Sequence, residues 1–200
     1  PDLGDRMLKS SFAVDGTFGL SGAPRFQSMT NADLTDEMLN ARAEVVAFFA
    51  VPTMGLAPDR VSRIVPRARD IVGFLAEYRP PPFPGPVDPT LVAEGEQIYR
   101  DGCAVCHGER APRGRHRDIP MERFANIIVP MDEIATDPSR WRAATPELAA
   151  AIARTPAASR LAVGPTAGYM APPLTGLWAT APYLHNGSVP TLWHLMHPEA

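Results

Sequence analysis

The sequence has little excess basic charge and no long hydrophobic run. Its 200 residues carry 19 lysines and arginines against 22 aspartates and glutamates, which gives a net charge of −3. Proteins that bind nucleic acid usually present a strongly basic surface, so this balance argues against a nucleic-acid partner. A helix that spans a bilayer needs about 18 apolar residues, and the apolar stretch VVAFFAV is ended by Pro52. We therefore expect no transmembrane segment.

Cysteine is almost absent, and the two cysteines that occur lie together. Cys103 and Cys106 belong to the segment DGCAVCHGE, in which His107 directly follows the second cysteine. A C-x-x-C-H segment is the attachment site of c-type haem. The two thiols add to the vinyl groups of the haem, and the imidazole becomes the proximal iron ligand. The sequence therefore predicts one haem c, held by Cys103, Cys106 and His107.

Two other uses of a cysteine pair compete with haem. A structural zinc site needs four ligands. His194 and His197 lie three residues apart, but no further cysteine supports zinc. A thioredoxin-like redox pair requires a βαβ setting, which the proline-rich flanks of this motif do not provide. Haem is therefore the favoured interpretation.

Helix signals occur at four places in the chain. The segment 36–51 follows Thr35 as N-cap and is ended by Pro52. A second helix is expected to begin near Pro66, with an apolar stripe that we expect to be buried: Ile71, Phe74, Leu75 and Tyr78. Asp88 caps a third helix that runs into the haem motif, and Thr145 caps a fourth. Longer alternating strand patterns are missing.

Proline is abundant, with 23 residues. The segment RPPPFPGPVDP, residues 79–89, cannot be helical and reads as a semi-rigid connector. We therefore expect a mainly α fold: a cytochrome c-type haem domain with long Pro-rich loops over residues 81–200, preceded by a short helical segment over residues 1–80. Because the chain begins at Pro1 without a leader, we expect it to be processed or partial, and the haem domain to be truncated at its C-terminal end.

Large anchoring side chains fill the segment GYMAPPLTGLWATAPYLHNGSVPTLW near the C-terminus. Its tyrosines and tryptophans suit a proline-braced loop that caps one face of a haem, and its methionine and histidine are candidate iron ligands. The predicted haem-pocket residues are Tyr99, Trp178, Tyr183 and His185. Trp178 is also a candidate electron relay, although a buried tryptophan more often only packs.

Together with RPPPFPGPVDPTLVAEGEQIYRDGCAVCHG, this segment resembles the C-terminal haem domain of the bacterial di-haem cytochrome c peroxidase superfamily. The nearest branch is the peroxidase-like cytochromes that include the rubber oxygenases. The resemblance spans residues 79–196. It implies that Tyr183 to Gly187 match a loop whose histidine lies near the haem without binding iron. Family members carry a second C-x-x-C-H upstream, whereas residues 1–80 contain no cysteine. Either the first haem domain precedes Pro1, or the protein holds one haem.

The distal iron ligand stays open at the level of the sequence. Met170 is the candidate distal ligand within the chain, because it precedes prolines at a separation from His107 typical of small cytochromes. The alternative is a methionine that packs in the haem crevice. The resemblance implies instead a histidine beyond Ala200. The remaining options are His185, a histidine of the last turn (His194 or His197) and an open site.

Arginines follow the haem motif in the run ERAPRGRHRD. Arg110, Arg113, Arg115 and Arg117 are placed to neutralise haem propionates or to dock an acidic redox partner, with a solvated loop as the alternative. His116 reads as a surface residue.

Two classes of function fit these observations. An electron carrier would pass single electrons to a redox partner protein, such as another cytochrome. A peroxidase-like or oxygenase-like di-haem enzyme would act on peroxide or oxygen and needs a distal acid-base group. Candidates for that group rest on residue type alone: Glu122, Asp132, Glu133 and His116. The single haem motif favours the carrier, and covalent haem c predicts a periplasmic or otherwise extracytoplasmic location.

Overall fold

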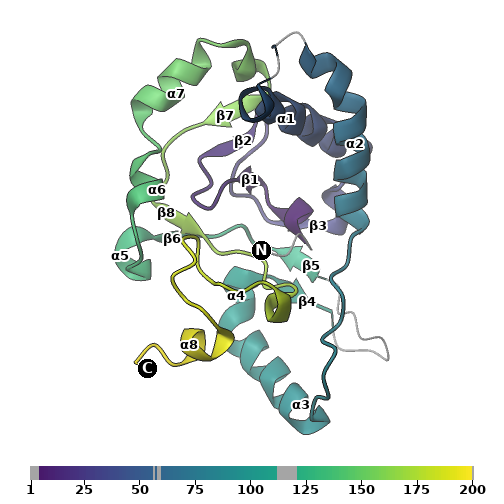
Figure 1. Cartoon of the computed structure of the whole chain (residues 1–200), viewed down its shortest axis with the longest axis vertical. Helices are drawn as coiled ribbons and strands as arrows, with labels where there is room; N and C mark the ends of the chain where they lie inside the picture. The colour runs from purple at the N-terminus through teal and green to yellow at the C-terminus, as the bar shows by residue number, and fades with distance from the viewer. Residues whose placement is uncertain (1–4, 56, 58–59, 112–120, 200) are drawn as a thin grey trace.

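Helices occupy both ends of the molecule, and short strands fill the region between them (Figure 1). This description rests on a computed structural model that covers residues 5–55, 57, 60–111 and 121–199. The α-helices are α1 (Asp36–Met54), α2 (Val61–Glu77), α3 (Pro89–Ile98), α4 (Ala104–His107), α5 (Met131–Ile134), α6 (Ser139–Arg142), α7 (Pro146–Ala153) and α8 (Leu192–Met196). The strands are β1 (Ser11–Phe12), β2 (Phe18–Leu20), β3 (Met29–Thr30), β4 (Glu109–Arg110), β5 (Met121–Phe124), β6 (Ile128–Pro130), β7 (Leu161–Val163) and β8 (Gly168–Met170).

The prediction of a mainly α fold is wrong, because the strands form three small antiparallel sheets. Their orders are β1-β2-β7, β3-β5-β4 and β6-β8. Each strand has only two to four residues, which is too short to show the alternation of apolar and polar residues by which strands are found in a sequence. Most partners are also far apart in the chain, so no hairpin signal marks them.

Residues from the two ends of the chain share these sheets. In the first sheet Phe18 pairs with Val163, and in the second Met29 pairs with Phe124. The buried side chain of Asn126 adds a further tie, because it accepts a hydrogen bond from the amide of Ser10 at 2.8 Å. The N-terminal segment thus packs with residues that follow the haem motif. The proposed domain boundary at residue 80 stays a prediction.

The predicted helix starts at Asp88 and Thr145 are confirmed by capping hydrogen bonds. The Asp88 carboxylate accepts from the amide of Thr90, and the Thr145 hydroxyl accepts from the amide of Leu148. The other two boundaries differ from the prediction. Helix α1 continues past Pro52 to Met54, and α2 begins at Val61, so that Pro66 lies inside it.

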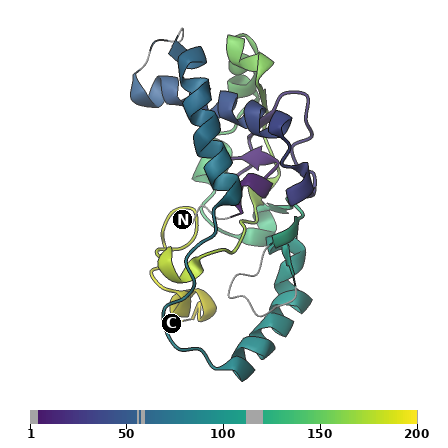
Figure 2. The same ribbon diagram turned by 90° about the vertical axis from the view of Figure 1, so that its right-hand side faces the viewer.

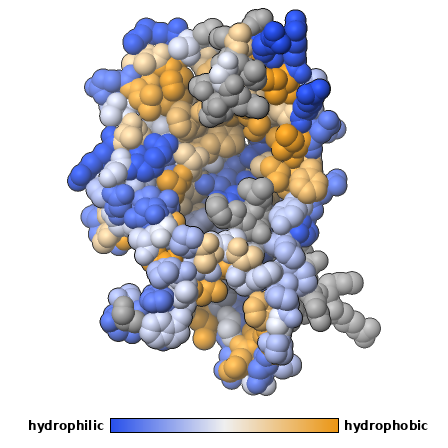
Figure 3. All heavy atoms as spheres, viewed as in Figure 1, coloured by the Kyte–Doolittle hydropathy of each residue, from blue (hydrophilic) through white to orange (hydrophobic). Residues whose placement is uncertain are grey.

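The apolar stripe predicted to be buried on α2 does not lie on the buried face of this helix. Ile71 and Phe74 are 55% and 64% exposed, and hydrophobic residues accordingly reach the molecular surface (Figure 3). The buried face of α2 carries Ala68 and Val72 instead, which pack against the alanine-rich face of α1. Small side chains let two helices approach closely, and a search for large apolar residues misses such a face.

The proline-rich segment 79–88 runs from α2 to α3 along one edge of the molecule (Figure 2). The indole N–H of Trp178 donates to the carbonyl of Pro81 at 3.2 Å, and Phe83 meets the same indole edge-on. The connector is therefore tied to the C-terminal loop. Among the described residues no helix has the length and apolar character to cross a membrane.

Candidate haem site

The haem motif lies on a continuous helical segment with one change of winding. Helix α3 leads into a π-helical turn over Tyr99–Cys103, and α4 follows directly and ends at His107. Single π turns inside α-helices are rare and often occur at functional sites. Gly108 ends the segment with φ of +102°, a conformation that favours glycine. The chain then turns into β4.

The imidazole of His107 is held by a backbone carbonyl far along the sequence. Its Nδ1 lies 2.8 Å from the carbonyl oxygen of Pro172. A carbonyl oxygen can only accept a hydrogen bond, so this contact assigns the proton to Nδ1. The lone pair then belongs to Nε2, which makes no hydrogen bond within the described part of the chain. A metal-binding histidine is usually oriented in this way.

Cys103 and Cys106 are free thiols, and both are partly exposed. Two accessible thiols on one helical turn, followed by an imidazole with a free Nε2, form the donor set that haem c requires. Within the described ranges no group of three or more histidine, cysteine, aspartate or glutamate side chains is arranged to hold a metal ion.

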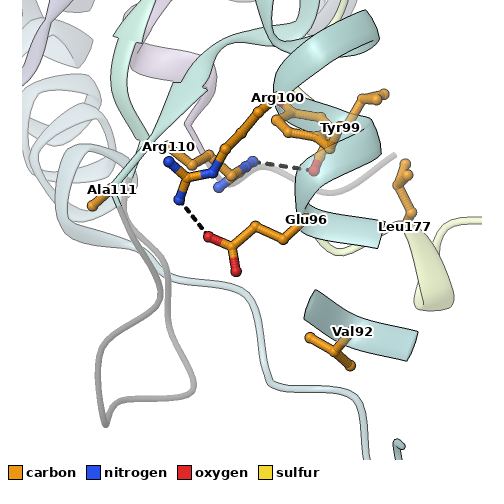
Figure 4. Close-up of a pocket in the computed structure, with 8 residues that line it drawn as sticks. Val92, Glu96, Tyr99, Arg100, Arg110, Ala111 and Leu177 are labelled. Atoms are coloured by element: carbon orange, nitrogen blue, oxygen red, sulfur yellow. Dashed lines mark hydrogen bonds and ion pairs between the residues drawn. The ribbon is translucent and has the colours of Figure 1, made fainter. Parts of the chain in front are cut away.

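A cavity of about 310 Å³ opens beside the motif (Figure 4). Its lining residues come from α3, the π turn, β4 and the loop after β8: Val92, Glu96, Tyr99, Arg100, Arg110, Ala111, Leu174 and Leu177. The hydroxyl of Tyr99 donates to the carbonyl of Gly108 at 2.7 Å. Burial is the main cause of the raised pKa of Tyr99, so its hydroxyl stays protonated at neutral pH.

Arg110 is not part of a solvated loop. Its guanidinium donates to the carbonyl of Leu174 at 3.1 Å and to the hydroxyl of Thr175 at 2.8 Å, and it lies 3.4 Å from the carboxylate of Asp5. A further interaction joins it to Tyr99 (Figure 4). The rest of the basic run lies outside the described residues: Arg113, Arg115, His116 and Arg117.

Met170 lies in a hydrophobic cluster of the protein interior. Its side chain is 2% exposed and packs with buried residues of η1 (Arg6–Leu8), β3 and β5: Leu8, Met29, Met121 and Phe124. The thioether sulfur accepts a hydrogen bond from Ser11 at 3.8 Å. The side chain therefore packs in the interior, and packing in a haem crevice stays a prediction. Ligation of iron by Met170 stays a prediction.

Tyr183 and Trp178 anchor the C-terminal loop. Tyr183 is buried, pairs with Val189 in an isolated antiparallel bridge, and donates its hydroxyl to the carbonyl of Leu177 at 2.5 Å. Leu177 lines the cavity, so this hydrogen bond from Tyr183 helps to hold one wall of the cavity in place. Trp178 is 39% exposed and holds the connector through Pro81. Their contact with a haem stays a prediction.

His185 lies against Tyr169. The two rings are 4.6 Å apart, and His185 Nε2 is 3.8 Å from a carboxylate oxygen of Asp137. Tyr169 in turn donates to the backbone carbonyl of Asp137 at 2.7 Å. Hydrogen bonds from the amide and hydroxyl of Ser139 are the main cause of the lowered pKa of Asp137, so this carboxylate is charged beside the histidine at neutral pH.

The remaining candidates are exposed. His194 and His197 lie at the end of the chain, where their Nδ1 atoms contact the hydroxyl of Thr191 and the carbonyl of Trp193. The acid-base candidates on β5 and α5 also face solvent: Glu122, Asp132 and Glu133. No hydrogen bond or ion pair within the described residues joins any of them to the haem motif.

Sequence reasoning missed three residues beside the motif: Pro172, Asp5 and Thr175. They act through hydrogen bonds to His107 or Arg110 across 65 to 105 positions of the chain. The only local hint is that Pro172 and Thr175 belong to the proline-rich stretch APPLT, which follows Met170. Nothing in the sequence around Asp5 indicates its role.

A protein-family model described as RoxA-like, cytochrome c-like matches residues 168–200. Two proteins of Sinorhizobium fredii (strain NBRC 101917 / NGR234) are similar to the chain, and both are described as uncharacterized. Protein y4iM is 30% identical over 149 residues, which cover 64% of this chain and 33% of the relative. Protein y4iJ is 29% identical over 177 residues, which cover 63% and 30%. The chain thus spans about a third of the length of these relatives. No solved structure matches it.

Residues 168–200 are therefore a cytochrome c-like region. This region supplies the carbonyl of Pro172 and the cavity residues Leu174 and Leu177, whereas the cysteines and His107 precede it by more than 60 positions. The fold brings the two parts together. The wider assignment to the di-haem peroxidase superfamily stays a prediction.

Proposed function

We propose that this protein is a c-type cytochrome that carries one haem c on Cys103, Cys106 and His107. The observation that supports it most is the hydrogen bond between His107 Nδ1 and the carbonyl of Pro172. It joins the C-x-x-C-H segment to the cytochrome c-like region, and it directs the free nitrogen of the imidazole away from the carbonyl. The chain holds one C-x-x-C-H segment, which supports the proposal of one haem c within it.

Each residue of the site has a defined task in this proposal. The bound haem supplies the exchange of single electrons between ferrous and ferric iron. Cys103 and Cys106 would hold the haem covalently, and His107 would offer Nε2 to the iron. Pro172 keeps the proton on Nδ1 and sets the orientation of the ring. The apolar side chains of Leu174 and Leu177 line the cavity beside the motif and would limit the access of water to the bound group.

We further propose that the protein transfers electrons outside the cytoplasm, in the periplasm or an equivalent compartment, because haem c is attached there. Its partner would be a redox protein, such as another cytochrome. Exposed apolar side chains near the haem motif support such a contact, among them Ile98 and Val105, which are 69% and 63% exposed. Small, transient contacts of this kind are typical of electron-transfer proteins.

An enzyme is the second candidate. The match of residues 168–200 to a RoxA-like family favours a peroxidase-like or oxygenase-like protein, of which this chain would be the C-terminal haem part. In that case one face of the iron would bind peroxide or oxygen. Of the acid-base candidates, Glu122, Asp132 and Glu133 face solvent, and His116 lies outside the described residues. The single haem motif of the chain is what favours the carrier.

The test is expression in a bacterial host that attaches haem c. We expect acid acetone to leave the haem on the polypeptide and the pyridine haemochrome to have a c-type spectrum. The double variant Cys103→Ser and Cys106→Ser should lose the covalent haem and keep its fold. Haem that extracts freely from the unmodified protein, or stoichiometric zinc in its place, would contradict the proposal. Carbon monoxide and peroxide then separate the two candidates, because an unchanged spectrum indicates a carrier and a rapid change indicates an enzyme.

A further inference from the structure

We propose that Arg110, Thr175 and Asp5 form a latch that positions the carbonyl of Pro172 against His107 and thereby adjusts the reduction potential of the haem. The inference rests on the proposed function, because it concerns the proximal ligand of that haem. Within the described residues no hydrogen bond or ion pair joins any of the three to the imidazole. They are positioning residues, and they act through the loop that carries Pro172.

The latch joins the same two chain segments as the hydrogen bond between His107 and Pro172, at positions three residues further along each segment. His107 meets Pro172, and Arg110 meets Thr175, so both segments advance by three positions. Arg110 also donates to the carbonyl of Leu174 at 3.1 Å, between the two contacts. The loop from Pro172 to Thr175 is therefore held to the haem motif at both of its ends.

Thr175 is the centre of the latch. Its hydroxyl accepts a hydrogen bond from Arg110 at 2.8 Å and donates one to the carboxylate of Asp5 at 2.7 Å. The guanidinium of Arg110 and the Asp5 carboxylate are also paired directly. A hydroxyl that donates and accepts at once fixes its own rotamer. Asp5 adds the N-terminal segment, so three distant parts of the chain meet here.

Burial makes the latch rigid. The side chains of Asp5 and Arg110 are 9% and 18% exposed, and Thr175 is 9% exposed. Charged groups with so little contact to water are costly to leave without partners. The loop therefore cannot leave the haem motif without uncovering a buried charge. This holds the Pro172 carbonyl at hydrogen-bond distance from the imidazole.

The strength of the hydrogen bond from Nδ1–H affects the iron. A firm bond gives the imidazole more anionic character and makes it a better donor to iron, which favours the ferric state. Loosening the latch should therefore raise the reduction potential. A nearby cation favours the more reduced, less positive iron, so removing the positive charge of Arg110 lowers the reduction potential. A variant of Arg110 would therefore show a smaller rise of the potential than a neutral variant, or a fall. The two effects have opposite signs, and a neutral substitution separates them.

The decisive variant is Thr175→Val in the haem-loaded protein, because valine keeps the shape of threonine and changes no charge. We expect a higher reduction potential in a spectroscopic titration. By nuclear magnetic resonance, the Nδ1 proton of His107 should exchange with solvent about tenfold faster, as the loss of one buried hydrogen bond predicts. Thr175→Ser retains the hydroxyl and should restore both values. Thr180→Val is the control, since the Thr180 hydroxyl donates to the carbonyl of Leu177 in the same loop and makes no hydrogen bond to the latch within the described residues.

Two results would overturn the latch. One is a folded, haem-loaded Thr175→Val protein with the potential and the proton exchange of the unmodified protein. The other is an equal shift in Thr180→Val, which would show a general effect of the loop. Should Thr175→Val fail to fold, the exchange of the same proton in Asp5→Asn decides in the same way. An unmodified protein without covalent haem would contradict the proposed function itself and the latch with it.

Discussion

The sulfur of Met170 lies 3.8 Å from the hydroxyl oxygen of Ser11, inside a cluster of buried side chains. Methionines fill much of this cluster, because Met29 and Met121 are also fully buried. Gly108, the residue directly after His107, lies so close to Met121 that an added Cβ atom would be 2.6 Å from its sulfur. Buried methionine side chains therefore pack next to the end of the haem motif.

Replacing Met170 tests whether it packs or binds iron. We expect Met170→Ala to reduce the free energy of unfolding by about 2–5 kcal/mol, as is usual when a buried side chain leaves a cavity. The exposed Met196 is the matched control, and Met196→Ala should change stability little. With the sulfur in the cluster we expect the spectrum of the oxidised haem to stay unchanged. Loss of a methionine-to-iron charge-transfer band would instead identify Met170 as the distal ligand.

The conformation of Gly108 predicts a sensitive position. A Cβ atom at this residue would lie 2.6 Å from the Met121 sulfur, and its φ of +102° strains any other residue. We expect Gly108→Ala to reduce the free energy of unfolding by about 2 kcal/mol. Gly102 lies on the other side of the motif, and a Cβ atom added there would meet nothing within 4 Å, so Gly102→Ala should be tolerated. Chemical denaturation of both variants checks the difference, and equal losses would contradict it.

Asn126 links the N-terminal segment to β5. Its amide nitrogen donates to the backbone carbonyls of Leu8, Gln27 and Phe124, and its side chain is 1% exposed overall. Asn126→Asp would replace these donors by a carboxylate that faces carbonyl oxygens. We expect a loss of about 3 kcal/mol or more in unfolding free energy. Asn186→Asp is the control, because only an acceptor is needed there, for the amide of Ser188. Similar melting temperatures of the two variants would refute this role.

Lys9 predicts a dependence of stability on pH. Burial lowers its pKa from 10.5 to about 8, and the charge of Arg6 adds to this effect. Below pH 8 the folded protein carries the full cost of a buried charge, about 3 kcal/mol. Between pH 8 and 10.5 the unfolded chain binds more protons than the folded chain. The free energy of unfolding should therefore rise with pH across this window.

Lys9→Met removes this titration, so the rise should disappear while the fold is kept. Arg42 is the neighbouring buried cation whose pKa is also lowered by burial, to about 10, and it adds to the slope only above that pH. Urea denaturation at several pH values between about 8 and 10 measures the difference between the two proteins. An equal rise in both would show that another group is responsible.

Local features of this protein follow from its sequence. The haem motif depends on three residues within five positions, and the caps at Asp88 and Thr145 depend on hydrogen bonds to amides two or three residues away. Such interactions need no knowledge of the rest of the chain. The proline-rich connector belongs to the same class, because proline restricts its own backbone and that of its predecessor.

Only the tertiary structure decided the rest. The strands are too short to carry a pattern, and two of the pairings join residues more than 90 positions apart, Met29 with Phe124 and Phe18 with Val163. Packing against the alanines of α1 determines which face of α2 is buried, and the apolar stripe within α2 does not reveal that face. The carbonyl that orients His107 is 65 residues distant, and the carboxylate of the latch is 105 residues from Arg110. Contacts at these separations depend on how the whole chain packs, so the sequence points to His107 as a candidate ligand but not to the residues that position its ring.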